Sequence, residues 1–191
     1  MEGFKNLLKK KIAVYFVLIL LIGGLFYFWQ QSQSEIRELN KKLPPEIKIV
    51  KSLIGNEYQL VNQIDNYSFL VPKKWKGLAR AEYTPERTEF GFTGSSIFVM
   101  GKNGEARTVS VDVFKAGNPD DLRQWAQKFL ETFEFTPRSL LEEQVGDFPV
   151  IITRQTDFGP YIYFLEASAK VYLFSGGSEE SVKYIISHGR W

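Results

Sequence analysis

The one histidine, His188, is the side chain with the most obvious chemistry, because imidazole gains and loses a proton near neutral pH. It follows a segment of helical spacing near the end of the chain. A cation at the C-terminus of a helix is stabilised by the helix dipole. A catalytic triad would also need a nucleophile and a carboxylate, and no motif places them beside His188. We therefore expect a helix-end role for it and no catalytic residue.

Paired acids are the next candidates for chemistry. They occur at Asp120 and Asp121, at Glu142 and Glu143, and at Glu179 and Glu180. The first and last pairs open predicted helices, and neighbours in a strand point to opposite faces, so none forms an acid/base pair. Calcium at Asn118, Asp120 and Asp121 is a weak alternative, because the alternating oxygen ligands of an EF-hand are absent. We expect no metal and no cofactor.

Residues 84–96 form the longest segment that the pattern leaves irregular. It contains two phenylalanines, Phe90 and Phe92, beside a run rich in Gly, Ser and Thr. The lysine and spacing of a P-loop are missing, so a phosphate site is not indicated. The segment is either a plain surface loop or a binding loop that exposes Phe90 and Phe92 to a partner.

A cationic turn around one tryptophan is the second candidate binding surface. Its members are Lys73, Lys74, Trp75, Lys76 and Arg80. Four cations close to an aromatic ring could touch lipid head groups or a wall polymer, while the plainer interpretation is a solvated turn. Pro72 can end the preceding strand, and Trp75 can fold back over the end of the sheet.

Short β-like runs dominate the C-terminal three quarters of the chain. They are residues 57–61, 67–71, 95–100, 107–114, 139–145, 150–155, 161–167 and 170–174. An Asn-Gly pair at 103–104 predicts a hairpin over residues 95–114. A helix is expected from an Asn118 cap to Phe133, with its apolar stripe on a sheet, and a second from Ser178. These elements predict an α+β domain with a mainly antiparallel sheet flanked by helices.

The run Tyr-Ser-Phe-Leu-Val-Pro-Lys-Lys-Trp at residues 67–75 resembles the opening of PsbP-like and Mog1-like domains. The later order is also similar, with a hairpin, a helix opened by Asn-Pro-Asp-Asp, the run Val-Gly-Asp-Phe-Pro-Val at 145–150, a meander and a terminal helix. The resemblance covers roughly residues 57–191. It implies an antiparallel sheet between helical layers and a non-enzymatic accessory or binding domain outside a bacterial membrane. It brings no catalytic motif.

Composition limits the remaining possibilities. The 191 residues are 44% hydrophobic and 24% charged, which is typical of a folded chain, and they include no cysteine. Disulfide scaffolds, thiol nucleophiles and zinc sites built on several His or Cys are therefore excluded. Beyond residue 11 the chain holds 20 basic and 21 acidic residues, so a nucleic-acid partner is not expected.

Residues 12–29 carry no charge and predict a single transmembrane helix. Eighteen helical residues rise about 27 Å, close to the hydrocarbon thickness of a bilayer. Residues 1–11 hold four Lys and one Glu, which favours a cytoplasmic N-terminus. A signal peptide cleaved near Ser34 is the alternative, although the apolar run is long for one and ends in bulky aromatics.

Four segments result: a basic tail at 1–11, the membrane helix at 12–29, a stalk at 30–45 and an extracytoplasmic α+β domain at 46–191. We expect a single-pass protein of a bacterial cytoplasmic membrane, with its N-terminus inside. It would contact the bilayer through residues 12–29 and an unknown envelope protein or wall polymer through its domain. The expected role is a non-catalytic binding or assembly module. The alternative is a carboxylate-dependent envelope hydrolase, which should show acids converging in a pocket with perturbed pKa values.

Overall fold

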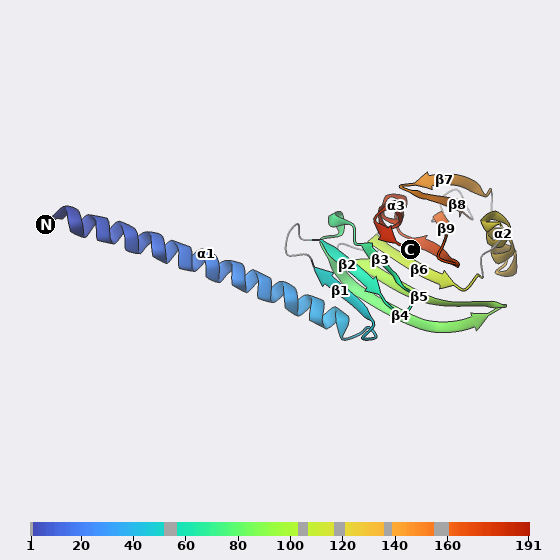
Figure 1. Ribbon diagram of the computed structural model, residues 1–191, viewed down its shortest axis with the longest axis horizontal. Helices are drawn as coiled ribbons and strands as arrows, with labels where there is room; N and C mark the ends of the chain where they lie inside the picture. Colours follow the sequence, from blue (N-terminus) through green and yellow to red (C-terminus); the bar gives the residue numbers. More distant parts are fainter. Residues whose placement is uncertain (1, 52–56, 103–106, 117–120, 136–138, 155–160) are drawn as a thin grey trace. The chain divides into compact units, whose positions relative to one another are not determined.

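The computed structural model describes residues 2–51, 57–102, 107–116, 121–135, 139–154 and 161–191 (Figure 1). The chain divides into two compact units, Met1–Glu38 and Leu39–Trp191. All of the strands among the described residues lie in the second unit. The predicted hairpin turn at 103–104 and the expected helix residues 118–120 lie outside the described residues.

The first unit belongs to the long helix α1 (Glu2–Asn40). Helix α1 is continuous, so the N-terminal part of the predicted stalk is helical. Nine large apolar side chains between residues 15 and 27 are exposed: Tyr15, Val17, Leu18, Ile19, Leu20, Leu21, Ile22, Phe26 and Tyr27. Among the residues whose placement is described, no helix meets the length and apolarity needed to cross a membrane. Side chains at 1–14, 16, 25, 28, 29 and 32 lie outside that set.

The second unit is built around a seven-stranded antiparallel sheet, sheet B. Its strands are β4 (Leu78–Glu89), β5 (Phe92–Gly101), β6 (Thr108–Phe114), β7 (Leu141–Val145), β8 (Phe148–Arg154), β9 (Tyr161–Ala167) and β10 (Lys170–Gly176). Their spatial order is β4-β5-β6-β10-β9-β8-β7. Four consecutive residues of β10, Val171 to Phe174, are buried, so both faces of the sheet are buried at this strand and each face needs a covering layer.

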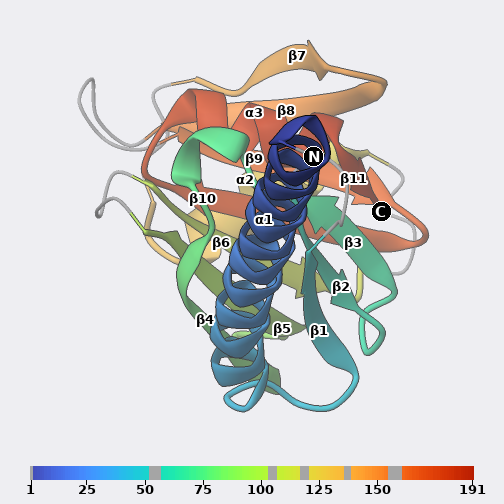
Figure 2. The same cartoon turned by 90° about the vertical axis from the view of Figure 1, so that its left-hand side faces the viewer.

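One face of sheet B is covered by a small second sheet and by a helix. Sheet A consists of β1 (Ile47–Lys51), β2 (Tyr58–Asn62), β3 (Tyr67–Leu70) and β11 (Gly189–Arg190), of which the first three run side by side in Figure 2. Helix α3 (Glu179–Ser187) contacts β3, β7 and β10. The ring of Trp191 packs between the layers, 5.5 Å from Tyr67 and 4.9 Å from Phe174 between ring centroids.

The opposite face of sheet B is covered by helix α2 (Leu122–Thr132), which contacts β8 and β9. Buried residues of the helix and of three strands form this core: Ala126, Phe129, Leu130, Ile151, Phe164, Val171 and Leu173. The apolar stripe predicted for this helix therefore lies on a sheet, as expected. The chain is an α+β protein with two antiparallel sheets, which confirms the predicted fold class at that level.

Most strand predictions agree with the structure, but the segment at 84–96 does not. This segment is not a loop: its residues belong to the ends of β4 and β5, joined by a two-residue turn at Phe90 and Gly91. Pro85 is one reason for the difference, because proline is typical of loops and rare within strands. It lies on β4, an edge strand, between Thr84 and Arg87, where the register shifts and no ladder donor is needed.

The predicted N-cap of the first domain helix is also wrong by three residues. Asp121, not Asn118, caps α2 in extended conformation, and its carboxylate accepts hydrogen bonds from the backbone N–H groups of Arg123 and Gln124. Asp and Asn cap helices equally well, so composition alone did not decide between them. Ser178 caps α3 as predicted, and Val182, Ile185 and Ile186 are buried.

Candidate binding pocket

A cavity of about 470 Å³ lies between the C-terminal part of α2 and sheet B. Its apolar lining is Phe92, Phe114, Phe129, Leu130, Phe133, Phe135, Ile162 and Leu173; the other lining residues are Arg87, Glu89, Gly94, Ser95, Ser96, Asp112 and Ser175. This volume lies in the range of small-molecule sites, and a mostly apolar wall with a few polar groups is typical of them. The pocket is the candidate site.

Phe92 is the centre of the aromatic wall. Its ring lies edge-on to the rings of Trp125 and Phe129, with centroids 5.3 and 5.1 Å apart, and to Phe114 at 6.2 Å. Phe129 continues the cluster to Phe133 at 4.6 Å. Edge-to-face pairs of this kind contribute about 0.5–1.5 kcal/mol each beyond burial, so the cluster is a rigid wall.

The turn between β4 and β5 projects Phe90 beside this wall. Phe90 and Gly91 both have positive φ, 51° and 84°, as a type I′ hairpin turn requires. Gly adopts this conformation without strain, whereas a bulky residue rarely does. The Phe90 side chain is 73% exposed, and its ring lies edge-on to Phe133 with centroids 5.2 Å apart. Phe90 therefore stands at the rim, while Phe92 lines the interior.

The end of α2 positions Phe135 over the pocket through a Schellman motif. The backbone N–H of Phe135 donates to the carbonyl of Leu130 at 2.8 Å, and that of Glu134 donates to Glu131 at 3.1 Å. Glu134 has a φ of 57°, the left-handed conformation that glycine usually takes at this position. The motif turns the chain back, so that Phe135 joins Leu130 in the lining.

Close packing of β5 against Phe114 shapes the floor. A Cβ atom on Gly94 would lie 2.5 Å from the carbonyl oxygen of Val113 and 2.8 Å from Cδ1 of Phe114. Any larger residue would therefore displace the ring of Phe114, which lines the pocket. Gly94 is required here by close approach.

Asp112 is the one carboxylate on the floor among the described lining residues. It lies on β6, on the same strand face as Phe114, because alternate residues of a strand share a face. Burial raises its pKa; weaker opposing effects come from hydrogen bonds with Ser96 and Ser110 and from the charge of Arg87. The Ser110 hydroxyl donates to Oδ2 of Asp112 at 3.3 Å.

The rim of the pocket holds a pair of opposite charges. Nη1 of Arg87 lies 3.4 Å from Oε1 of Glu89, and both side chains are largely exposed. The lining therefore contains three titratable groups, and Arg87 and Glu89 offset each other's charge. When Asp112 is ionised, the described part of the lining carries one net negative charge.

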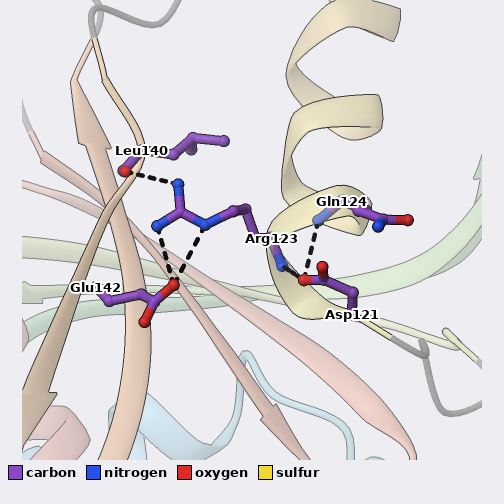
Figure 3. A network of polar contacts seen from close by, with 5 residues as sticks. All are labelled: Asp121, Arg123, Gln124, Leu140 and Glu142. Atoms are coloured by element: carbon purple, nitrogen blue, oxygen red, sulfur yellow. Dashed lines mark hydrogen bonds and ion pairs between the residues drawn. The ribbon is translucent and has the colours of Figure 1, made fainter.

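A polar network away from the pocket fixes the start of α2 (Figure 3). The guanidinium of Arg123 donates from Nε and Nη2 to Oε1 of Glu142, at 3.2 and 2.9 Å, and from Nη1 to the carbonyl of Leu140 at 2.9 Å. Glu142 lies on β7, so this network ties the helix to the edge of sheet B. It positions the helix that walls the pocket.

In the cationic turn, which is one of the predicted binding surfaces, the tryptophan is buried and most of the cations are paired with acids. Trp75 is completely buried, and its Nε1 donates to Oγ of Ser181 at 3.1 Å, so the ring has the structural role predicted as its alternative. Three of the four cations are paired: Lys73 with Glu57 at 2.7 Å, Lys74 with Glu180 at 2.5 Å and Arg80 with Glu82 at 2.7 Å. These pairs reduce the positive charge that Lys76 and its neighbours offer to an anion.

The other sequence candidates take structural roles. His188 is the C-cap of α3, and its Nδ1 lies 2.9 Å from the carbonyl oxygen of Tyr184, as its predicted helix-end position requires. Glu142 pairs with Arg123 of α2 and Glu143 pairs with Lys183 of α3, so the two acids face opposite sides of the sheet, as predicted. Within the described residues, no three acids or His side chains gather as a metal site would require.

The sequence predicts Phe92 as an exposed loop residue, whereas Phe92 lies half-buried on β5 and lines the pocket. The apolar stripe of α2 was predicted, and Asp112, Arg87 and Glu89 were not named. The signal for Asp112 was present, because residues 109–114 read Val-Ser-Val-Asp-Val-Phe. Asp112 lies on the strand face opposite the valines, and a helix is expected to cover this sheet. The pattern therefore indicates a carboxylate that is buried at a cost in free energy, as is found at functional sites.

Comparison with known proteins gives no further assignment. No family model, no curated protein and no solved structure matches this chain.

Proposed function

We propose that this chain is a non-catalytic binding module whose site is the pocket beneath α2, which takes a small and mainly apolar ligand. The observation that carries the proposal is the cavity of about 470 Å³ walled by five phenylalanines. A cavity this size that is walled by rigid aromatic rings favours binding by burial of apolar surface. Phe90 and Phe92, the residues expected to anchor a partner, belong to its rim and wall.

We also propose that residues 12–29 anchor this module in a bacterial cytoplasmic membrane, with the domain outside. The exposed apolar side chains of α1 between residues 15 and 27 support this, because such a surface is stable in lipid and costly in water. We also propose that the domain has a fold of the PsbP/Mog1 type. An antiparallel sheet with helices on both faces is its support.

A titration with a neutral apolar probe tests the binding function. Full-length chain in phosphatidylcholine nanodiscs, with labelled Ile and Leu methyl groups, is titrated with 4-phenylbutan-1-ol and followed by NMR. We expect the methyl signals of Leu130, Ile162 and Leu173, which line the pocket, to shift, while those of Ile49 and Leu60 in sheet A stay fixed.

Two matched variants complete this test. Ser175→Leu fills the pocket and should abolish the shifts, because Ser175 lies in the lining. Ser139→Leu makes the same chemical change at an exposed position and should leave the shifts unchanged. The binding function is wrong if the pocket methyls do not respond or if both variants behave alike.

A second function, a carboxylate-dependent envelope hydrolase, is favoured by one observation. Asp112 has a raised pKa inside a pocket, as a general acid requires. The described lining offers only Glu89 as a second carboxylate, and Glu89 is paired with Arg87 at the rim. Hydrolysis of wall polymer by the wild-type chain that is lost in Asp112→Asn would establish this alternative over the binding module.

A further inference from the structure

The charges of the pocket indicate which ligands it can hold. Its floor carries Asp112, a half-buried carboxylate in a mainly apolar lining, and the hydroxyls of Ser96 and Ser110 hold it rather than a cation at close range. A buried carboxylate is stable as an ion only beside a positive charge or several donors. A cationic group of a ligand could therefore pair with Asp112 on the floor.

Arg87 does not fill this role. Its guanidinium lies at the rim, 3.4 Å from Glu89, and the Arg87 side chain is largely exposed. Its charge lowers the pKa of Asp112 only as the least of the contributing causes, and burial prevails. An anionic ligand would meet the carboxylate on the floor and an arginine already paired with Glu89. Charge complementarity therefore favours a cation over an anion.

We propose that the pocket binds an amine that is protonated at neutral pH and carries an apolar body, with the ammonium group against Asp112 and the body among the phenylalanine rings. This rests on the proposed binding function. The ammonium donates to the carboxylate, and the hydroxyls of Ser96 and Ser175 lie in the same lining as further acceptors. Aromatic rings attract a cation as well as an apolar chain, so Phe92, Phe114 and Phe129 suit both parts of the ligand.

The strength of the effect follows from the kind of contact. A hydrogen bond to a charged group is stronger than a neutral one, and it is strengthened further where water is excluded. We expect the amine to bind at least about tenfold more tightly than a neutral molecule of the same shape. Removing the charge of Asp112 should remove this preference and leave the apolar contribution.

Three matched probes test the proposal: 4-phenylbutylamine, 4-phenylbutan-1-ol and 4-phenylbutanoate. Each is titrated at pH 7 into the full-length chain in phosphatidylcholine nanodiscs, and the methyl signals of Leu130, Ile162 and Leu173 give the dissociation constant. Empty nanodiscs measure how much probe the lipid takes up. The amine should bind about tenfold or more tightly than the alcohol, and the carboxylate should bind most weakly.

Two variants assign the preference to the floor. Asp112→Asn should reduce the amine to the affinity of the alcohol, while Asp147→Asn, the same change at an exposed turn residue, should not. Equal binding of amine and alcohol to the wild-type pocket, or tightest binding of the carboxylate, overturns the amine proposal and leaves the binding function standing. If no probe shifts the pocket methyls, both are overturned.

Discussion

Asp112 lowers the stability of the native chain at neutral pH, and it is also the residue proposed to bind the ammonium group of the ligand. Its carboxylate lies on β6 in the lining of the mainly apolar pocket, and burial raises its pKa. In the native chain the group therefore holds its proton more tightly than in the unfolded chain. A buried group that lowers stability at neutral pH is common at functional sites, where pKa values are commonly perturbed.

The pH dependence of stability tests this environment. Between about pH 4, where an unfolded Asp titrates, and the higher native pKa, the native state binds more protons than the unfolded state, so stability falls as pH rises. Asp112→Asn removes this fall in stability, because asparagine does not titrate. The free energy of unfolding of the variant, relative to wild type, should increase from pH 3 to pH 7 in urea titrations.

Asp147→Asn is the control for this prediction, because Asp147 is exposed in the turn between β7 and β8. Its stability relative to wild type should change little over the same pH range. A flat or falling difference for Asp112→Asn would show that the carboxylate is well solvated, contrary to the structure.

At the scale of elements, the position of α2 decides whether the pocket exists. Its N-terminus is held by Asp121 and Arg123, and its C-terminus by the Schellman motif that carries Phe135. The helix was predictable from its apolar stripe and from the acidic residues at its start, of which Asp121 is the N-cap. Its contact with the edge of sheet B was not, because the partner Glu142 is 19 residues away and its sequence gives no pairing rule.

The strained end of α2 gives a prediction about stability. Glu134 adopts left-handed backbone with φ 57°, which glycine adopts without steric cost. Glu134→Gly should therefore raise the free energy of unfolding by about 1 kcal/mol in urea titrations. Glu131→Gly, three residues earlier inside the helix, should lower it by about 1 kcal/mol. A loss of stability in both variants would contradict the Schellman motif.

The Arg123 network gives a second prediction at this scale. Arg123→Ala should lower the free energy of unfolding by about 1 kcal/mol, since the exposed ion pair contributes little and the bond to the Leu140 carbonyl contributes most. Arg123→Lys should recover less than half of this, because one ammonium cannot reach both partners as the guanidinium fork does. Wild-type stability for the lysine variant would show that charge alone matters there.

The edge strand β4 shows where sequence reasoning reached its limit. Residues 84–96 contain Pro85, Gly91 and Gly94, which together indicate a loop. In the structure all three belong to a hairpin: Pro85 lies at a register shift, Gly91 lies in the turn and Gly94 packs closely against Phe114. These roles depend on contacts with β6 and on the edge position of β4, which belong to the tertiary structure.

For the whole molecule, the proposed arrangement is a binding domain displayed outside a membrane by residues 12–29. The chain contains no cysteine, so a single introduced cysteine reports its own location. In intact bacterial cells, Asp147→Cys should react with a membrane-impermeant maleimide and Asn6→Cys should react only after lysis. Labelling of Asn6→Cys in intact cells, or protection of Asp147→Cys, would contradict the proposed orientation.

The central claim is that the pocket beneath α2 is the ligand site, and photo-crosslinking tests it most directly. Full-length chain in its native membrane is irradiated with a diazirine derivative of 4-phenylbutylamine, and the modified residues are identified by peptide sequencing in a mass spectrometer. The account predicts that label lies on β5, β6 and the C-terminal half of α2, and that excess 4-phenylbutylamine removes it. Label confined to α1 or to surfaces outside these elements, or label that competitor does not remove, would contradict it.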